Sequence, residues 1–455
     1  MTQEGQPSGA ASRPDKFVLR SVLPEWTPLY VGFLLFLIAI ITYKIPVGQV
    51  GLILGVLALI FSREKLRFPP PMVALTVLLL LAALGQPGSI NPPASSKELV
   101  AAGKTWVIAL MAYNAIRTKK QFRFAILFAC TLYAYVPVSP VLVNYALGIT
   151  TAGRAEGPFI YINPNDLAAI SLLALGITLW VINTEPMQKS LRLIGYGFAG
   201  AIAVMILLTQ SRAGFLGLVV FGIPYALSSA RRGVRPIALL VAAAVGAAVF
   251  VPSSAWERIA GIAKLTSEET IAEADPEGSA EQRLKMVKAA IQITSEHPLL
   301  GVGIGGIGQA NYDVGLGGGP SKGRIIGPGR DTHNTYLKMS AEMGIPALIV
   351  FLIMLGLVYR PLTRVRRSLR ESQPATAAGF GYIQNGFLAF MVAGVFGSYA
   401  WLSVYHVFLA IMWSGASLWL ARTAVPAQHA SPISPGRPQP VLIRQRVPVV
   451  PRRGH

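Results

Sequence analysis

Apolar segments of about 20 residues recur along most of this chain, and that recurrence constrains the fold more than any other feature. A segment of this length is what an α-helix needs to cross the hydrocarbon core of a bilayer. Of the 455 residues, 53% are hydrophobic and only 13% are charged. The pattern predicts an all-α integral membrane protein and does not fit a water-soluble enzyme.

The apolar segments predict about 12 transmembrane helices and one large loop outside the membrane that contains short helices. We expect spans at 28–43, 46–62, 70–86, 99–116, 122–147, 165–183, 191–209, 212–230, 236–252, 334–359, 379–397 and 401–421. The uninterrupted run from Leu193 to Ala230 would measure about 57 Å as one helix, against a hydrocarbon core of about 30 Å. We therefore predict two spans there, with a turn at Thr209 to Gly214.

Lysine and arginine set the orientation of these spans, because cytoplasmic loops of membrane proteins carry an excess of both. With the N-terminus in the cytoplasm, the inner loops hold 17 of them, and the short outer connections and span mouths hold six. The predicted organisation is a cytoplasmic tail (1–27), helices 1–9 (28–251), one large outer loop (252–332), helices 10–12 (333–421) and a disordered, basic, Pro-rich cytoplasmic tail (422–455). The membrane domain as a whole spans 28–421. The chain has 40 basic and 20 acidic residues. We attribute the excess of basic residues to the orientation of the spans and to contacts with membrane lipids, and we expect no nucleic-acid partner.

Arg212 interrupts the apolar stretch "ILLTQSRAGFLG" at the predicted outer end of the eighth span. Free backbone N–H groups at a helix N-terminus favour an anion, and a guanidinium adds paired hydrogen bonds that suit phosphate. Arg212, with Ser211 beside it, is therefore a candidate anion site. An arginine that only anchors a helix end among lipid headgroups is the alternative.

His333 and Asn334 lie where the long loop meets the tenth span, in "RDTHNTYLKMSAEMGIPAL". A helix N-terminus favours the neutral imidazole, which suits a general base. The alternative is that Thr332 or Asn334 caps the helix and His333 is incidental.

Two further stretches hold candidate residues. Arg154, Asn163 and Asn165 precede the sixth span, where Asn-Pro-Asn is also an ordinary helix start. Arg283 lies in a predicted loop helix from Glu281 to Ser295, in which Leu284, Val287 and Ile291 recur at helical spacing.

Metal and cofactor sites find little support in the sequence. Gly303, Gly305 and Gly308 match G-x-G-x-x-G, but no strand–helix–strand unit surrounds them, which argues against a dinucleotide site. Cys130 is the single cysteine, and the histidines have no metal-ligand spacing. We expect neither a metal nor a cofactor.

In combination, "GRAEGPFIYINPNDLA", "TQSRAGFLGL", "SEHPLLGVGIGGIG" and "HNTYLKMSAEMGIPAL" resemble the O-antigen ligase and O-antigen polymerase superfamily of bacterial membrane glycosyltransferases, over roughly residues 150 to 360. The resemblance implies a multi-pass protein of the bacterial inner membrane whose active site faces the periplasm. It implies transfer of a glycan from undecaprenyl pyrophosphate to a hydroxyl acceptor, for which we favour lipid A-core because one outer loop dominates.

Carried over residue by residue, the resemblance makes His333 the catalytic residue. Arg212 and Arg283 would bind the pyrophosphate, with Arg154 as a third ligand. Met286 stands near a position where the family often has tryptophan. Ser211, Asn334, Asn163 and Asn165 would play supporting roles. An O-antigen or exopolysaccharide polymerase remains open, as does a polysaccharide transporter or flippase, in which charges usually lie near the midplane of the membrane.

Overall fold

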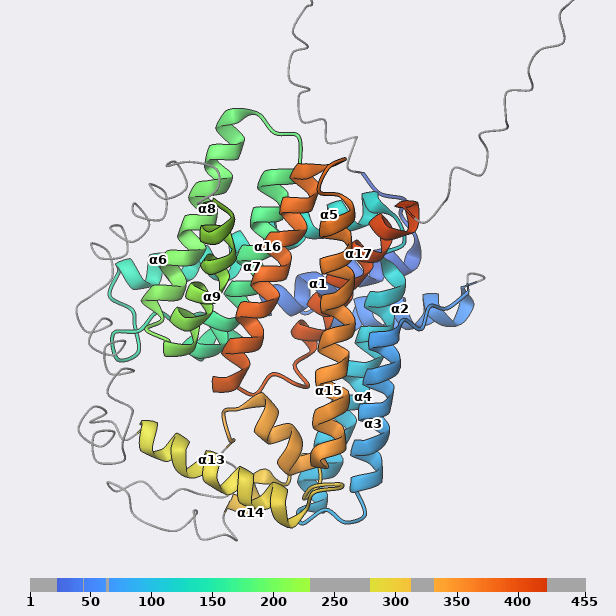
Figure 1. Cartoon of the computed structure of the whole chain (residues 1–455), viewed down its shortest axis with the longest axis vertical. Coiled ribbons are helices and arrows are strands. Elements are labelled where there is room, and N and C mark those ends of the chain that lie inside the picture. Colours follow the sequence, from blue (N-terminus) through green and yellow to red (C-terminus); the bar gives the residue numbers. More distant parts are fainter. Residues whose placement is uncertain (1–22, 44, 63–64, 230–278, 312–330, 424–455) are drawn as a thin grey trace, which may run out of the picture.

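The computed structural model describes residues 23–43, 45–62, 65–229, 279–311 and 331–423. These residues form helices and no β-strand (Figure 1). The α-helices are α1 (Pro28–Thr42), α2 (Gly48–Phe61), α3 (Pro70–Gly85), α4 (Pro92–Ala115), α5 (Lys119–Tyr133), α6 (Ser139–Ala146), α7 (Pro164–Thr184), α8 (Lys189–Leu208), α9 (Arg212–Ser229), α13 (Ser279–Glu296), α14 (Ile307–Asn311), α15 (Thr335–Ser368), α16 (Pro374–Ala393) and α17 (Ser403–Thr423). The short segments are η2 (Ala134–Val138), η3 (Phe159–Ile162) and η6 (Gly394–Phe396).

The apolar helices make this a multi-pass membrane protein. Six helical segments are long and apolar enough to cross a bilayer: α5 through α6, α7, α8, α15, α16 through η6, and α17. Four shorter apolar helices are α1, α2, α3 and the first part of α9. Eleven of the predicted spans coincide with these helices or with α4, while the predicted span 236–252 lies outside the described residues, as do most of the two predicted tails.

Three features of the helices can be compared closely with the prediction. The break in the run from Leu193 to Ala230 lies where we expected it, because α8 ends at Leu208 and α9 begins at Arg212. The predicted span 122–147 is interrupted at η2. Val136, the residue before Pro137, has a non-helical backbone conformation there. Helix α15 continues to Ser368 and is kinked at Gly344, whose φ is 82°.

The centre of the bundle is formed by α7, which packs closely against α16. A Cβ at Gly176 would lie 2.8 Å from the Tyr382 carbonyl oxygen, and one at Gly386 would lie 2.8 Å from the Leu172 carbonyl oxygen. Glycine at both positions lets the two backbones approach, as small residues do between membrane helices.

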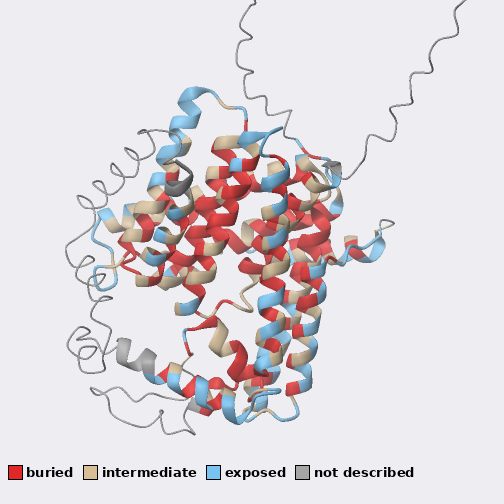
Figure 2. Ribbon diagram, viewed as in Figure 1, coloured by how far each residue is buried: buried red, intermediate tan, exposed pale blue. Residues whose placement is uncertain are grey.

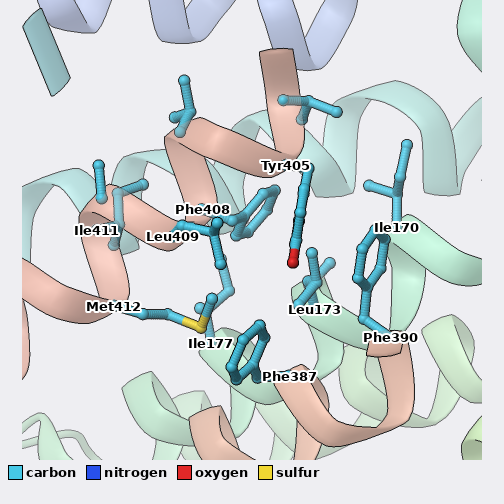
Figure 3. Close-up of a cluster of buried hydrophobic side chains, with 14 of the residues drawn as sticks. Ile170, Leu173, Ile177, Phe387, Phe390, Tyr405, Phe408, Leu409, Ile411 and Met412 are labelled. Carbon is cyan, nitrogen blue, oxygen red and sulfur yellow. The ribbon is translucent and has the colours of Figure 1, made fainter. Parts of the chain in front are cut away.

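Side chains of α7, α16 and α17 fill the core beside this contact (Figure 3). Leu173 and Ile177 of α7 belong to one buried cluster with Phe387 of α16 and Phe408 of α17. Each of the four side chains is at most 3% exposed. Because such close-packed side chains leave little room for movement, the cluster fixes how the three helices lie relative to one another.

The inner faces of the helices are buried (Figure 2). Several exposed positions carry large apolar side chains. Ile53, Ile60, Leu193 and Ile194 on α2 and α8 are each more than 60% exposed. Apolar surface of this kind belongs against lipid rather than water. The exposed faces of these two helices therefore agree with a chain embedded in a bilayer.

The two ends of the bundle differ in chemistry. At the end where α7 finishes, Arg123 of α5 forms a paired ion contact with the buried Glu185, with Nε donating to Oε1 at 2.7 Å. At the other end, α13 and α14 pack against the first part of α15 (Figure 1). Ala290, Ile293 and Ala341 belong to the small apolar cluster that holds them together.

Helix α13 confirms the predicted loop helix. Ile291 is 55% exposed, whereas Met286, Ala290 and Ile293 are buried. Ala290 allows α13 to approach α15 closely, and Met286 and Ile293 supply the larger apolar side chains of the buried face. Met286, the position near which the resemblance expected tryptophan, belongs to this buried face.

Candidate functional site

The loop before α7 and the turn between α8 and α9 are held together by the side chain of Asn165. Its Oδ1 accepts hydrogen bonds from Ser211 Oγ at 2.8 Å and from Arg154 Nη2 at 3.3 Å. Arg154 Nε also donates to the carbonyl oxygen of Thr209 at 2.9 Å. Three of the predicted site residues are therefore in direct contact, although 46 positions separate Asn165 from Ser211.

Arg212 is the first residue of α9 and is partly buried. Ser211 caps this helix, because its Oγ accepts a hydrogen bond from the backbone N–H of Gly214 at 3.2 Å. Gln210 precedes the cap with a φ of 51° and donates from Nε2 to the carbonyl oxygen of Gly153 at 2.9 Å. The position of Arg212 thus depends on both the helix cap and the loop that carries Arg154.

His333 is exposed and lies one residue before the cap of α15. Asn334 is the cap, with Oδ1 accepting from the N–H groups of Tyr336 and Leu337 at 3.0 Å each. The capping role considered for Asn334 is thus correct. It leaves the exposed His333 immediately before the start of the helix.

The segment between α16 and α17 connects the starts of α15 and α7. Thr335 Oγ1 donates to the carbonyl oxygen of Gly397 at 2.6 Å and accepts from the backbone N–H of Tyr399 at 3.0 Å. The Tyr399 hydroxyl donates to the backbone oxygen of Asn165 at 3.5 Å and also hydrogen-bonds Asp166. Tyr399 therefore connects the segment after His333 to the Asn165 network.

Two acidic residues lie where these elements meet. Asp166, in the first turn of α7, interacts electrostatically with Asp331, two residues before His333. Asn163, the cap of α7, accepts from the Asn165 N–H at 3.0 Å and hydrogen-bonds Asp166. The starts of α7 and α15 are thus close enough for their charges to interact.

Backbone strain concentrates at the same end of the protein. Among the described residues, five other than glycine have a positive φ, and four of these lie in the loops just considered: Ala152, Phe159, Gln210 and His333. A positive φ is costly for residues with a Cβ and recurs at functional sites, where the surrounding structure enforces it. Gln210 and His333 occupy the same position in their two helices, immediately before the cap.

The glycine-rich stretch after α13 is a packing element. Gly301 and Gly344 both have positive φ, and a Cβ on either would overlap the backbone of the other segment, at Glu342 and Leu299 respectively. Val302 N–H donates to the Ala341 carbonyl oxygen at 3.0 Å. The glycine-rich turn that contains the dinucleotide-like pattern therefore docks at the kink of α15.

Arg283 falls within α13, but its side chain lies outside what the structure describes.

Tyr399, Asp166 and Asp331 were not among the predicted site residues. An acidic residue in the first turn after Asn163 was a visible signal for Asp166, whereas nothing local marked Tyr399. Among the described residues, no group of three His, Cys, Asp or Glu side chains could hold a metal ion.

Three helix starts with side-chain caps, α7, α9 and α15, thus lie at one end of the bundle together with Arg154, Arg212 and His333. Backbone N–H groups and helix dipoles at such starts favour negative charge. The arrangement can hold an anion near Arg212 and presents the exposed imidazole of His333 as a candidate proton acceptor.

Comparison with known proteins bears on the same region. Residues 197–352 match the model of the O-antigen ligase family. No curated protein matches the chain. The match includes Arg212, Arg283 and His333, whereas Arg154, Asn163 and Asn165 precede it. It confirms, over residues 197–352, the resemblance found in the sequence.

Proposed function

We propose that the protein is an O-antigen ligase-like glycosyltransferase of the bacterial inner membrane. Its donor is a glycan on undecaprenyl pyrophosphate and its acceptor is a hydroxyl group of lipid A-core at the periplasmic face. The observation that carries this proposal is the network joining Arg154, Asn165 and Ser211 at the start of α9, which fixes the position of Arg212. The match to the O-antigen ligase family supports the class of reaction.

In the proposed reaction, the acceptor oxygen attacks the anomeric carbon of the donor glycan. A carbon–oxygen bond forms to the acceptor while the bond from the anomeric carbon to the pyrophosphate oxygen breaks. The acceptor proton passes to His333, and the electron pair of the broken bond leaves with undecaprenyl pyrophosphate. His333 is exposed at the start of α15, where a substrate hydroxyl can reach it.

Arg212 stabilises the negative charge that develops on the leaving pyrophosphate. Its guanidinium lies at a helix N-terminus, so the backbone N–H groups of α9 act on the same charge. Arg283 is proposed as a second pyrophosphate ligand. Arg154 was predicted as a third pyrophosphate ligand. Its Nε donates to the Thr209 carbonyl oxygen and its Nη2 donates to Asn165 Oδ1. We therefore propose that Arg154 positions the α8–α9 turn.

Complementation separates this function from the alternatives. A strain that lacks the gene receives either the wild type or His333→Ala, at matched levels of inserted protein, and surface glycans and lipid-linked intermediates are resolved by gel. A ligase restores full-length glycan on lipid A-core, and His333→Ala accumulates lipid-linked polymer instead. Restoration of chain length without a change in attachment identifies a polymerase. If the lipid-linked glycan stays on the cytoplasmic side of the membrane in the strain that lacks the gene, the protein is a transporter.

A further inference from the structure

A cavity of about 210 Å³ lies beside the first part of α15 and has no role in the mechanism above. Its walls come from α4, from the turn around Ile304, from α15 and from residues 398–402 before α17. Thr335, two residues after His333, is part of the wall. The cavity therefore reaches the first residue of the helix that begins just after the proposed catalytic residue.

Two polar atoms in this wall are buried without a partner. Among the side chains that the structure describes, Glu342 Oε1 and Ser398 Oγ belong to the few buried polar atoms that make no hydrogen bond. Glu342 is only 2% exposed, and its carboxyl group accepts a hydrogen bond from the backbone of Gly305. An unpaired buried polar group costs about 1–3 kcal/mol. Two in one cavity indicate a ligand that hydrogen-bonds both.

The charge around the cavity excludes an anionic ligand. Lys338, Asp331 and Glu98 act on the Glu342 carboxyl group. Lys338 is already engaged, with its Nζ 3.4 Å from Asp331 Oδ1. Even when Glu342 is protonated, the two negative charges of Glu98 and Asp331 exceed the single positive charge of Lys338. Pyrophosphate therefore belongs with Arg212, and the ligand of this cavity is neutral or carries an amine.

The size and lining of the cavity suit one sugar ring. Its volume corresponds to about seven water molecules at roughly 30 Å³ each, below the range of drug-sized pockets. Carboxyl and hydroxyl groups bind sugar hydroxyls, while Trp401, Met339 and Met343 provide apolar surface for the ring carbons. Few other substrates of a glycan transferase combine this size with this polarity.

We propose that the cavity lined by Glu342, Ser398 and Trp401 binds a single neutral or amino sugar ring of the glycan substrate. The ring would come from the donor or from the acceptor. This inference rests on the proposed function, because it assumes that glycans are the substrates. The cavity would then place one ring while His333 acts on the neighbouring bond.

Steady-state transfer by the full-length protein in nanodiscs tests this subsite. Ser398→Ala removes one hydroxyl, and Glu342→Gln keeps the shape of the side chain while changing its hydrogen bonding. Ser414→Ala is the matched control, since Ser414 Oγ is also buried and unpaired but lies in α17 away from the cavity. We expect KM to rise about threefold for Ser398→Ala and about tenfold for Glu342→Gln, with kcat near wild type. Varying donor and acceptor separately shows which one supplies the ring.

Saturation-transfer NMR provides a readout that does not need turnover. The probes are methyl glycosides of glucose, galactose, glucosamine and N-acetylglucosamine, with inorganic pyrophosphate as the anionic comparison. At least one glycoside should bind the wild type and His333→Ala alike and bind Glu342→Gln more weakly, while pyrophosphate binding stays unchanged. KM values and glycoside binding equal to those of Ser414→Ala in both variants would overturn the subsite. Glycoside binding that depends on Glu342 in a protein without transfer activity would instead contradict the proposed function alone.

Discussion

Replacing Asn165 by alanine should loosen the contact between the loop before α7 and the α8–α9 turn. The substitution removes the acceptor of two hydrogen bonds, from Ser211 Oγ at 2.8 Å and from Arg154 Nη2 at 3.3 Å. Each is worth about 1 kcal/mol, since the bond from the charged Arg154 is weakened by its partial exposure. The expected loss of stability is therefore about 2 kcal/mol.

This loss corresponds to a fall in Tm of about 2 °C for a chain of 455 residues. It is measured by tryptophan fluorescence on the purified protein at one fixed heating rate, because irreversible unfolding makes Tm depend on the rate. Glycan transfer should fall at least tenfold, since a small displacement of Arg212 weakens its contact with the leaving group.

Asn183→Ala is the matched control for Asn165→Ala. Asn183 lies at the other end of α7, where its side chain donates to the Leu179 carbonyl oxygen and accepts from the exposed Tyr196 hydroxyl. Its replacement should leave transfer unchanged. Arg154→Met combined with Asn165→Ala should lower Tm by less than the sum of the two single changes. Additive effects on Tm, or normal transfer by Asn165→Ala, would refute the coupling.

Three other substitutions test separate parts of the account. Arg212→Lys keeps the charge but loses the planar fork, so transfer should fall about tenfold or more in the reconstituted assay while Tm stays within about a degree. Asn334→Ala removes the cap of α15 at a cost of about 1–2 kcal/mol, read as a lower Tm, and Asn334→Ser should restore most of it. Gly344→Ala would overlap the Leu299 carbonyl group and should abolish accumulation of folded protein on size-exclusion chromatography. Gly356→Ala, with nothing within 4 Å of its Cβ, should accumulate normally.

Much of the helical framework could be predicted because each span is a local property of the sequence. The break in the run from Leu193 to Ala230 followed from its length alone, and α8 and α9 meet within the expected turn. The kink at Gly344 was not predicted, because it depends on the docking of Leu299 and Gly301 from a segment that is distant in the sequence.

The helix starts that form the candidate site could be predicted, but the hydrogen bonds that join them could not. Helix-start chemistry marked Arg212, His333 and Asn165, each from its own short stretch. Ser211 connects the start of α9 to Asn165, and Tyr399 connects the start of α15 to Asn165 across 234 positions. Contacts of this kind depend on how α7, α15 and α17 pack together, and no local pattern in one sequence encodes that packing.

The central claim is that His333 accepts the proton while Arg212 holds the leaving pyrophosphate. Its most direct test measures, in proteoliposomes, the release of undecaprenyl pyrophosphate and the formation of lipid A-core-linked glycan by the wild type and by His333→Ala. We expect equal amounts of both products from the wild type, and rates lower by about 10²–10⁴-fold for His333→Ala with donor binding unchanged. Transfer by His333→Ala at the wild-type rate, or glycan attachment without release of undecaprenyl pyrophosphate, would contradict it.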